Sequence, residues 1–209
     1  MSKRENNWQY TEQYPIETEP ISNARRMSLE CGIEPVSRAT TAYLSSVTVI
    51  GKVESILEIG TGVGVSALSM LKHTSKTHLT TIDIEPEYHT SAKEFLHQAG
   101  IAQSRTRLVT GDAGQILPRL NHNAYDLALI DANEEMLLDY VEQVLLIVKP
   151  GGTIIIPHAL RHGLVADPTV RDPLTSSIRD LLSTVADSPA IIPYLSPAGD
   201  GVLTLTRIG

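Results

Sequence analysis

The chain has 209 residues, of which 42% are hydrophobic and 20% are charged, so it has the length and composition of a protein that folds around one hydrophobic core. Its 17 basic residues against 24 acidic residues give a net charge of −7, which argues against nucleic acid as a partner because phosphate contacts supply most of such affinity. The single cysteine, Cys31, excludes an intramolecular disulfide and a cysteine-based zinc cluster. We expect a cytoplasmic protein without a membrane span, because the N-terminus is polar and no apolar run approaches 18 residues.

The N-terminal region differs from the rest of the chain in its polarity. Residues 1–18 are polar with interspersed aromatic side chains, which indicates either a mobile tail or an arm that packs on a partner subunit or covers a site. Residues 20–32 predict a short helix closed by Gly32, and residues 37–49 predict a second helix. We therefore expect an N-terminal tail followed by a single domain over residues 19–209.

From residue 55 onward, short apolar runs alternate with amphipathic segments. The predicted strands are 55–59, 79–84, 107–110, 125–130 and 153–156, and the predicted helices are 65–73, 86–99, 113–120, 134–148 and 170–186. Residues 190–195 and 202–206 flank a turn and predict a closing hairpin. This alternation predicts an α/β fold of the Rossmann-like kind, with a mostly parallel sheet covered on both faces.

A glycine-rich loop follows the first predicted strand, in the order Glu58-Ile-Gly60-Thr-Gly62-Val-Gly64. Glycines at this point let the backbone turn tightly and approach a ligand closely. The dinucleotide fingerprint is GxGxxG, but Val65 stands where its third glycine would be, which disfavours a nicotinamide-dependent oxidoreductase. Glu58 is well placed for an ammonium group, so the loop favours a ligand with an amino acid tail.

Two further carboxylates follow neighbouring strands. Asp83 ends the second strand and can accept both hydroxyls of a ribose, with Glu85 as the nearby competitor. Asp112 follows the third strand and can accept from an adenine amine, or it can serve only as the N-cap of the next helix. Ligands bind at the carboxyl ends of parallel strands, so these side chains together describe a site for S-adenosylmethionine.

Several stretches show a family resemblance, namely ILEIGTGVGVSALSML, LTTIDIEPE, TGDAGQILPRL, YDLALIDA, LLIVKPGGTIII and GDGVLTLTR. From about Val36 onward the chain resembles the S-adenosylmethionine-dependent O-methyltransferases of the catechol and caffeoyl-CoA type, and within them a bacterial, actinobacterial branch. The resemblance implies the class I methyltransferase fold, a seven-stranded sheet with an antiparallel last strand, and a homodimer. It also implies a cofactor pocket formed by Val36, Glu58, Gly60, Thr61, Gly62, Ser66, Asp83, Asp112, Ala113 and Asp131.

The chain departs from this family where its metal-dependent members bind Mg²⁺. Those members read Asp-Ala-Asp-Lys after the fourth strand and Asp-Asn after the fifth, whereas this chain has Asp131-Ala-Asn-Glu134 and Pro157-His158. Asp131 with one imidazole is a poor Mg²⁺ site, although together with Asn133 and water it leaves open a weak site for a softer ion. We predict no metal ligands and no Mg²⁺ requirement.

The resulting hypothesis is methyl transfer to a hydroxyl of a small molecule, with Asp131 orienting the acceptor or the methyl end and His158 helping to remove the proton. Two alternatives stay open: a cofactor-binding protein that has lost catalysis, and methyl transfer to a non-oxygen acceptor. His158 is also open to a structural interpretation, as a strand-end histidine satisfied by the backbone. Arg161 either binds an acidic substrate or is a solvated loop residue, and the histidines other than His158 and His162, His89 among them, receive no role.

Overall fold

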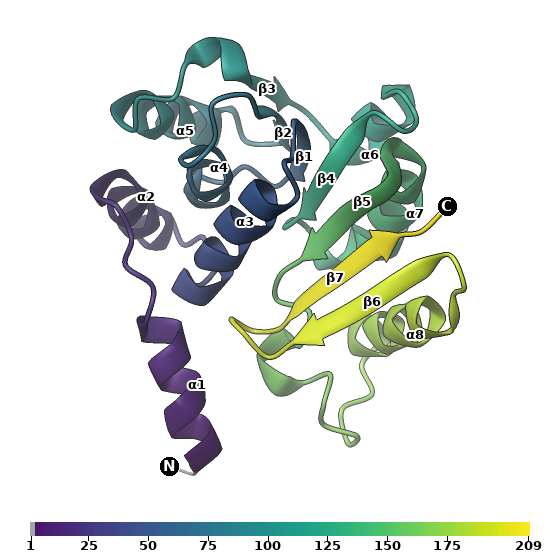
Figure 1. Ribbon diagram of the computed structural model, residues 1–209. Coiled ribbons are helices and arrows are strands. Elements are labelled where there is room, and N and C mark those ends of the chain that lie inside the picture. Colours follow the sequence, from purple (N-terminus) through teal and green to yellow (C-terminus); the bar gives the residue numbers. More distant parts are fainter. Residues whose placement is uncertain (1–2) are drawn as a thin grey trace.

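The computed structural model describes residues 3–209, and over these residues seven strands form one sheet in the order β3-β2-β1-β4-β5-β7-β6 (Figure 1). The strands are β1 (Ser55–Ile59), β2 (His78–Asp83), β3 (Thr106–Thr110), β4 (Tyr125–Ile130), β5 (Val148–Ile156), β6 (Ile191–Ser196) and β7 (Val202–Arg207). The first five strands are parallel, and β7 pairs antiparallel with both β5 and β6. The predicted fold class, with its antiparallel last strand, is confirmed.

Helices cover both faces of this sheet. They are α1 (Lys3–Gln13), α2 (Glu19–Glu30), α3 (Arg38–Ile50), α4 (Val65–Leu71), α5 (Pro86–Gln98), α6 (Ala113–Ile116), α7 (Leu137–Ile147) and α8 (Pro173–Asp187), with short 3₁₀ turns η1 (Gln103–Arg105), η2 (Leu117–Arg119), η3 (Glu134–Met136) and η4 (Arg161–Gly163). Because side chains alternate along a strand, Leu127 and Leu129 pack with α2–α5, whereas Ala128 and Ile130 pack with α6–α8. Within residues 3–209, no helix is both long and apolar enough to cross a membrane.

Some predicted boundaries were wrong, and for local reasons. The predicted helix 113–120 is an α-helical turn followed by a 3₁₀ turn, because Pro118 has no N–H to continue the α-helical pattern. The fifth strand begins at Val148 rather than at residue 153. Its two glycines, Gly151 and Gly152, have the sequence of a turn, but a register shift against Tyr125–Leu127 of β4 lets the strand continue through them.

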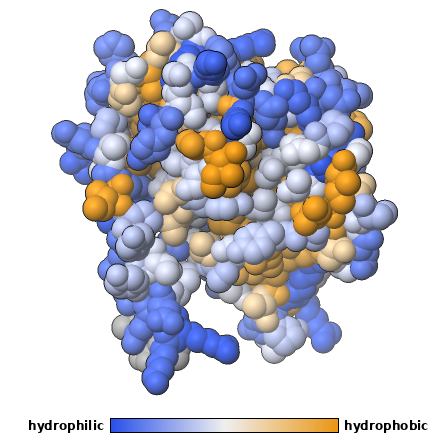
Figure 2. Space-filling view, viewed as in Figure 1, coloured by the Kyte–Doolittle hydropathy of each residue, from blue (hydrophilic) through white to orange (hydrophobic). Residues whose placement is uncertain are grey.

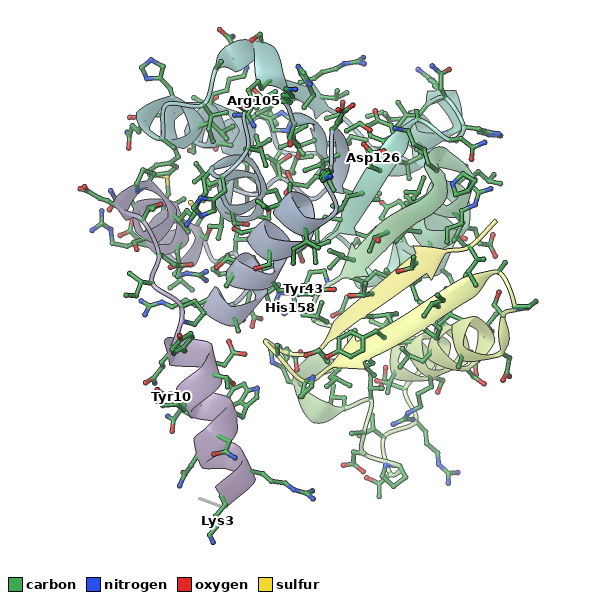
Figure 3. The ribbon with its side chains drawn as sticks, in the orientation of Figure 1. Lys3, Tyr10, Tyr43, Arg105, Asp126 and His158 are labelled. Carbon is green, nitrogen blue, oxygen red and sulfur yellow. The ribbon has the colours of Figure 1, made fainter. Side chains whose placement is uncertain are left out.

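The N-terminal segment contains helix α1, which stands apart from the body of the protein (Figure 1) and buries none of its side chains. It contacts the turn between β6 and β7: Trp8 Nε1 donates to the Pro197 carbonyl at 3.0 Å, and the Gly199 N–H donates to Glu12 at 2.6 Å. Tyr10 lies on this helix with most of its side chain exposed (Figure 3). The segment predicted as a tail or an arm is thus helical over Lys3–Gln13 and irregular over residues 14–18, and residues 1 and 2 lie outside the described residues.

Candidate active site

The glycine loop joins the ends of three strands. Gly60, Gly62 and Gly64 all have positive φ, at 91°, 47° and 95°. A Cβ on Gly60 would lie 1.8 Å from the carbonyl oxygen of Asp131, so only glycine lets β1 end this close to β4. Asp83 at the end of β2 accepts from the Gly62 N–H at 2.9 Å, which fixes the loop from the other side.

Glu58 lies at the base of this loop and is completely buried. The Ser66 hydroxyl donates to its Oε1 at 2.6 Å, but Oε2 has no hydrogen-bond partner within the described residues. Burial raises the pKa of Glu58 to about 7, although the hydrogen bonds from Ser66 and Thr81 oppose that rise. A buried carboxylate oxygen without a partner is energetically unfavourable, and an ammonium group would satisfy it.

Asp112 caps the helix that follows β3. Its Oδ1 accepts from the Gly114 N–H at 2.9 Å, so the N-cap interpretation is confirmed. The carboxylate is nevertheless exposed and lines the large pocket described next, so contact with an adenine amine stays a prediction.

Two adjoining pockets lie at the carboxyl ends of β1, β2 and β4. The larger measures about 490 Å³, and the predicted cofactor residues in its lining are Gly60, Gly62, Asp83, Asp112, Ala113 and Asp131. The smaller measures about 70 Å³, and the predicted residues in its lining are Val36, Gly60, Thr61, Gly62, Ser66 and Asp131. Glu58 does not line a pocket itself but lies behind Ser66. The structure therefore places nine of the ten predicted cofactor residues in the lining of these two pockets, and the tenth, Glu58, directly behind Ser66.

A third pocket, of about 180 Å³, lies between the ends of β4 and β5. The methyl-transfer hypothesis places the acceptor here, beside Asp131 and His158, so we call it the acceptor pocket. Asp131 lines it as well, and so does His158, which follows β5 in the left-handed conformation with φ of 56° (Figure 3). His158 Nε2 is buried without a partner among the described residues, which goes against an imidazole satisfied by the backbone. Burial raises the pKa of Asp131 to about 6; a charge on His158 opposes the rise, and Glu34 adds to it.

Two side chains near this pocket already have partners: Asn133, which a metal site would need, and Arg161, which an acidic substrate would need. Asn133 Oδ1 accepts from the Glu135 N–H at 3.0 Å and caps η3. Arg161 donates to Glu134 at 2.9 Å and also contacts Asp172, so both expectations for Arg161 were wrong: it is a mostly buried structural residue. Across residues 3–209, no three His, Cys, Asp or Glu side chains are grouped as possible ligands of one metal ion.

His89 is a buried part of this site that the sequence analysis left without a role. It lies on α5, and its two ring nitrogens hydrogen-bond with Thr61 at 3.0 Å and Thr110 at 2.9 Å. Thr61 is in the glycine loop and Thr110 precedes the Asp112 turn, so His89 connects the two loops that line the large pocket. Burial holds the pKa of His89 below its ordinary value, although Asp83 opposes this. The only sign of this contact in the sequence was Thr61, a hydroxyl residue directly after the first glycine of the loop, which needs a hydrogen-bond partner when buried.

Comparison with known proteins agrees with this geometry. Residues 20–208 match the O-methyltransferase family. A candidate O-methyltransferase of Mycobacterium avium is 39% identical over 188 residues, which cover 90% of this chain and 85% of the relative. Another, from Mycobacteroides abscessus, is 38% identical over 192 residues, which cover 91% of this chain and 89% of the relative.

Solved structures show the same fold. A protein of Corynebacterium glutamicum superposes with a TM-score of 0.90 at 23% identity, covering 100% of this chain and 98% of its own. The O-methyltransferase TomG of Streptomyces achromogenes, solved with S-adenosylmethionine, has a TM-score of 0.84 at 23% identity and full coverage of both chains. The chain therefore belongs to the O-methyltransferase family and has the class I methyltransferase fold, which confirms the family and enzyme class that the sequence predicted.

Proposed function

We propose that this protein transfers a methyl group from S-adenosylmethionine to a hydroxyl of a small molecule, with the reaction centred on Asp131. The observation that carries this proposal is that Asp131 lines all three pockets, the two at the glycine loop and the acceptor pocket. A residue in that position lies where a donor on one side and an acceptor on the other would meet.

S-adenosylmethionine is the cofactor, and the residues of the two glycine-loop pockets fit its parts. The unpartnered oxygen of Glu58 suits the ammonium of the amino acid tail. Asp83 would receive the ribose hydroxyls, and Asp112 the adenine amine. When bound, the cofactor supplies a methyl group activated by a sulfonium. The residues then have to align the acceptor, and such positioning can supply roughly 7–11 kcal/mol of a reaction barrier.

His158 is the proposed general base. Its Nε2 is buried, unpartnered and close to Asp131, so it is free to accept the proton that an acceptor hydroxyl loses. Asp131 would orient that hydroxyl and stabilise the imidazolium that forms. The residues at the ends of β4 and β5 do not offer the set of side-chain oxygens that Mg²⁺ prefers, because Asn133 Oδ1 caps η3 and Pro157 has no ligating side chain. We propose that turnover does not require Mg²⁺.

The test is a screen of phenols and other hydroxylated compounds. The product S-adenosylhomocysteine is hydrolysed in a coupled assay, and the homocysteine that it releases is the readout. His158→Ala should lower turnover strongly, whereas His122→Ala, a matched change at an exposed residue, should not. Activity should survive EDTA. Loss of activity in EDTA with recovery in Mg²⁺ would refute the metal-independent mechanism, and an unchanged His158→Ala would refute the base.

We also propose a homodimer, and the N-terminal helices offer a suitable surface. A groove of about 450 Å³ lies between the α1–α2 connection and α3, and beside it Ile16 is 93% exposed and Ile50 is 81% exposed. Figure 2 shows an apolar patch over this end of α3. Light scattering should give about twice the chain mass of 22.7 kDa, and a species at the single-chain mass would refute the dimer.

A cytoplasmic location stays a proposal. It is supported by the single cysteine, Cys31, which is free and exposed and therefore suits a reducing compartment. Cell fractionation with an antibody to the protein would test it, and recovery outside the cytoplasm would refute it.

A further inference from the structure

The acceptor pocket has the size of a single ring. Its volume is about 180 Å³, slightly more than the roughly 150 Å³ of an apolar cavity that takes up benzene. Its apolar lining consists of Ile130, Ala132, Leu137, Ile156, Pro157, Ala159 and Ile178. These walls favour a small apolar ring, and Asp131 and His158 in the same lining favour a hydroxyl on it.

The charged side chains of this pocket are unbalanced. Glu34, Asp131 and Glu134 line it, and no Lys or Arg among the described residues does. Of these three carboxylates, Arg161 pairs only with Glu134, at 2.9 Å. Glu34 and Asp131 are therefore left without a permanently charged partner, so the pocket carries a negative field.

Glu34 is the member of this set that a bound acceptor can reach from outside. Its side chain is 60% exposed, and its nearest charged contact is His162, 3.4 Å away, which carries a charge only when protonated. The field of Glu34 extends into the pocket, because its charge raises the pKa of Asp131. Glu34 also lines the small glycine-loop pocket, so it lies where the acceptor and cofactor sites adjoin.

We infer that the acceptor pocket selects single-ring hydroxylated compounds that carry a positive charge, such as a primary amine, and disfavours anionic ones, with Glu34 as the specificity-determining residue. The inference rests on the proposed function for the assignment of this pocket to the acceptor. The charge balance of the lining residues, however, is a separate observation and can be tested without turnover.

Three phenols of matched size provide the test: tyramine, 4-ethylphenol and 4-hydroxyphenylacetate. Their binding is measured by calorimetry with and without saturating S-adenosylhomocysteine. We expect tyramine to bind about fivefold more tightly than 4-ethylphenol, and 4-hydroxyphenylacetate to bind more weakly, as a partly exposed charge pair would give. Glu34→Gln should reduce the ratio of tyramine to 4-hydroxyphenylacetate affinity by about fivefold or more.

Glu142→Gln is the control, because it removes the same charge from an exposed site on α7 away from the pocket, and it should leave the ratio unchanged. Equal affinities, preference for the carboxylate, no binding of any of the three, or a ratio insensitive to Glu34→Gln would each overturn the inference. Failure of S-adenosylhomocysteine to bind would instead count against the proposed function. The inference about charge would still be tested, because the affinities of the three phenols are also compared without S-adenosylhomocysteine.

Discussion

Glu58 provides a test in which stability and cofactor binding should change in opposite directions. In the free protein its carboxylate is buried, and one oxygen lacks a partner among residues 3–209. A rise in pKa from the ordinary value of 4.5 to about 7 corresponds to roughly 3 kcal/mol of unfavourable ionisation in the folded state. The contribution of the protonated group to stability is therefore fully present below pH 4.5 and is lost as the pH rises through about 7.

Glu58→Gln retains the shape of the protonated form and cannot ionise. At pH 5 the variant and the parent should have similar free energies of unfolding, and at pH 8 the variant should be more stable by up to about 3 kcal/mol. The same change removes the charge that would face the cofactor ammonium. Since a hydrogen bond to a charged group contributes roughly 1.5–3 kcal/mol, the affinity for S-adenosylhomocysteine at pH 8 should fall by about one to two orders of magnitude.

Urea denaturation at both pH values and calorimetry at pH 8 measure these effects, with Glu142→Gln as the control for a surface charge. The parent protein, unlike Glu58→Gln, should also lose cofactor affinity as the pH falls below 7, because binding then requires Glu58 to lose a proton. A stability difference that is the same at pH 5 and pH 8, or an unchanged affinity in Glu58→Gln, would refute this reasoning.

Three further substitutions test the surrounding framework. Asp83→Ala removes both the acceptor for the glycine-loop N–H and the proposed ribose contact, so calorimetry should show at least about tenfold weaker cofactor binding; unchanged affinity would remove Asp83 from the site. His89→Ala breaks two buried hydrogen bonds to threonine hydroxyls, so urea denaturation should show a loss of roughly 2–3 kcal/mol, and a neutral result would contradict its connecting role. Asp172→Asn weakens the cap of α8. Hydrogen bonds from the Thr175 hydroxyl and backbone hold the pKa of Asp172 at about 2, so its contribution is present above pH 3.8 and is lost as the pH falls through about 2. Melting curves of variant and parent should differ at pH 6 and converge at pH 2, and a constant difference would contradict the cap.

The sequence was sufficient to predict which carboxylates lie together at the carboxyl edge of the sheet, because the rules for parallel sheets are local and directional. Each of Glu58, Asp83 and Asp112 lies in or directly after an apolar run, and such runs end at the same edge of a parallel sheet. Glycines with positive φ at the end of β1 could be expected from the same pattern. The gathering of these carboxylates at one edge of the sheet therefore followed from features within a few residues of each other.

Contacts between distant segments could not be predicted in this way. His89 lies in a stretch of α5 that is polar like a surface helix, and only the fold shows that it is buried against Thr61, 28 positions earlier in the chain. Helix α1 has almost no apolar face, so nothing in its own sequence marked where it packs. The role of Arg161 depends on Glu134, 27 positions away, and a loop sequence alone does not choose between an ion pair and solvent.

That ion pair also bears on whether the acceptor side is functional or has decayed. The chain departs from the metal-dependent members in two segments, Asn133-Glu134 and Pro157-His158, and Arg161 contacts both. Its backbone N–H donates to the His158 carbonyl at 3.0 Å, and its guanidinium donates to Glu134. Only the guanidinium contact depends on side chains, and it gives Glu134 a specific partner beside a pocket that stays open at about 180 Å³. That pocket also presents an imidazole nitrogen without a partner among the described residues. An open pocket with an available base favours an enzyme over a cofactor-binding protein that has lost catalysis.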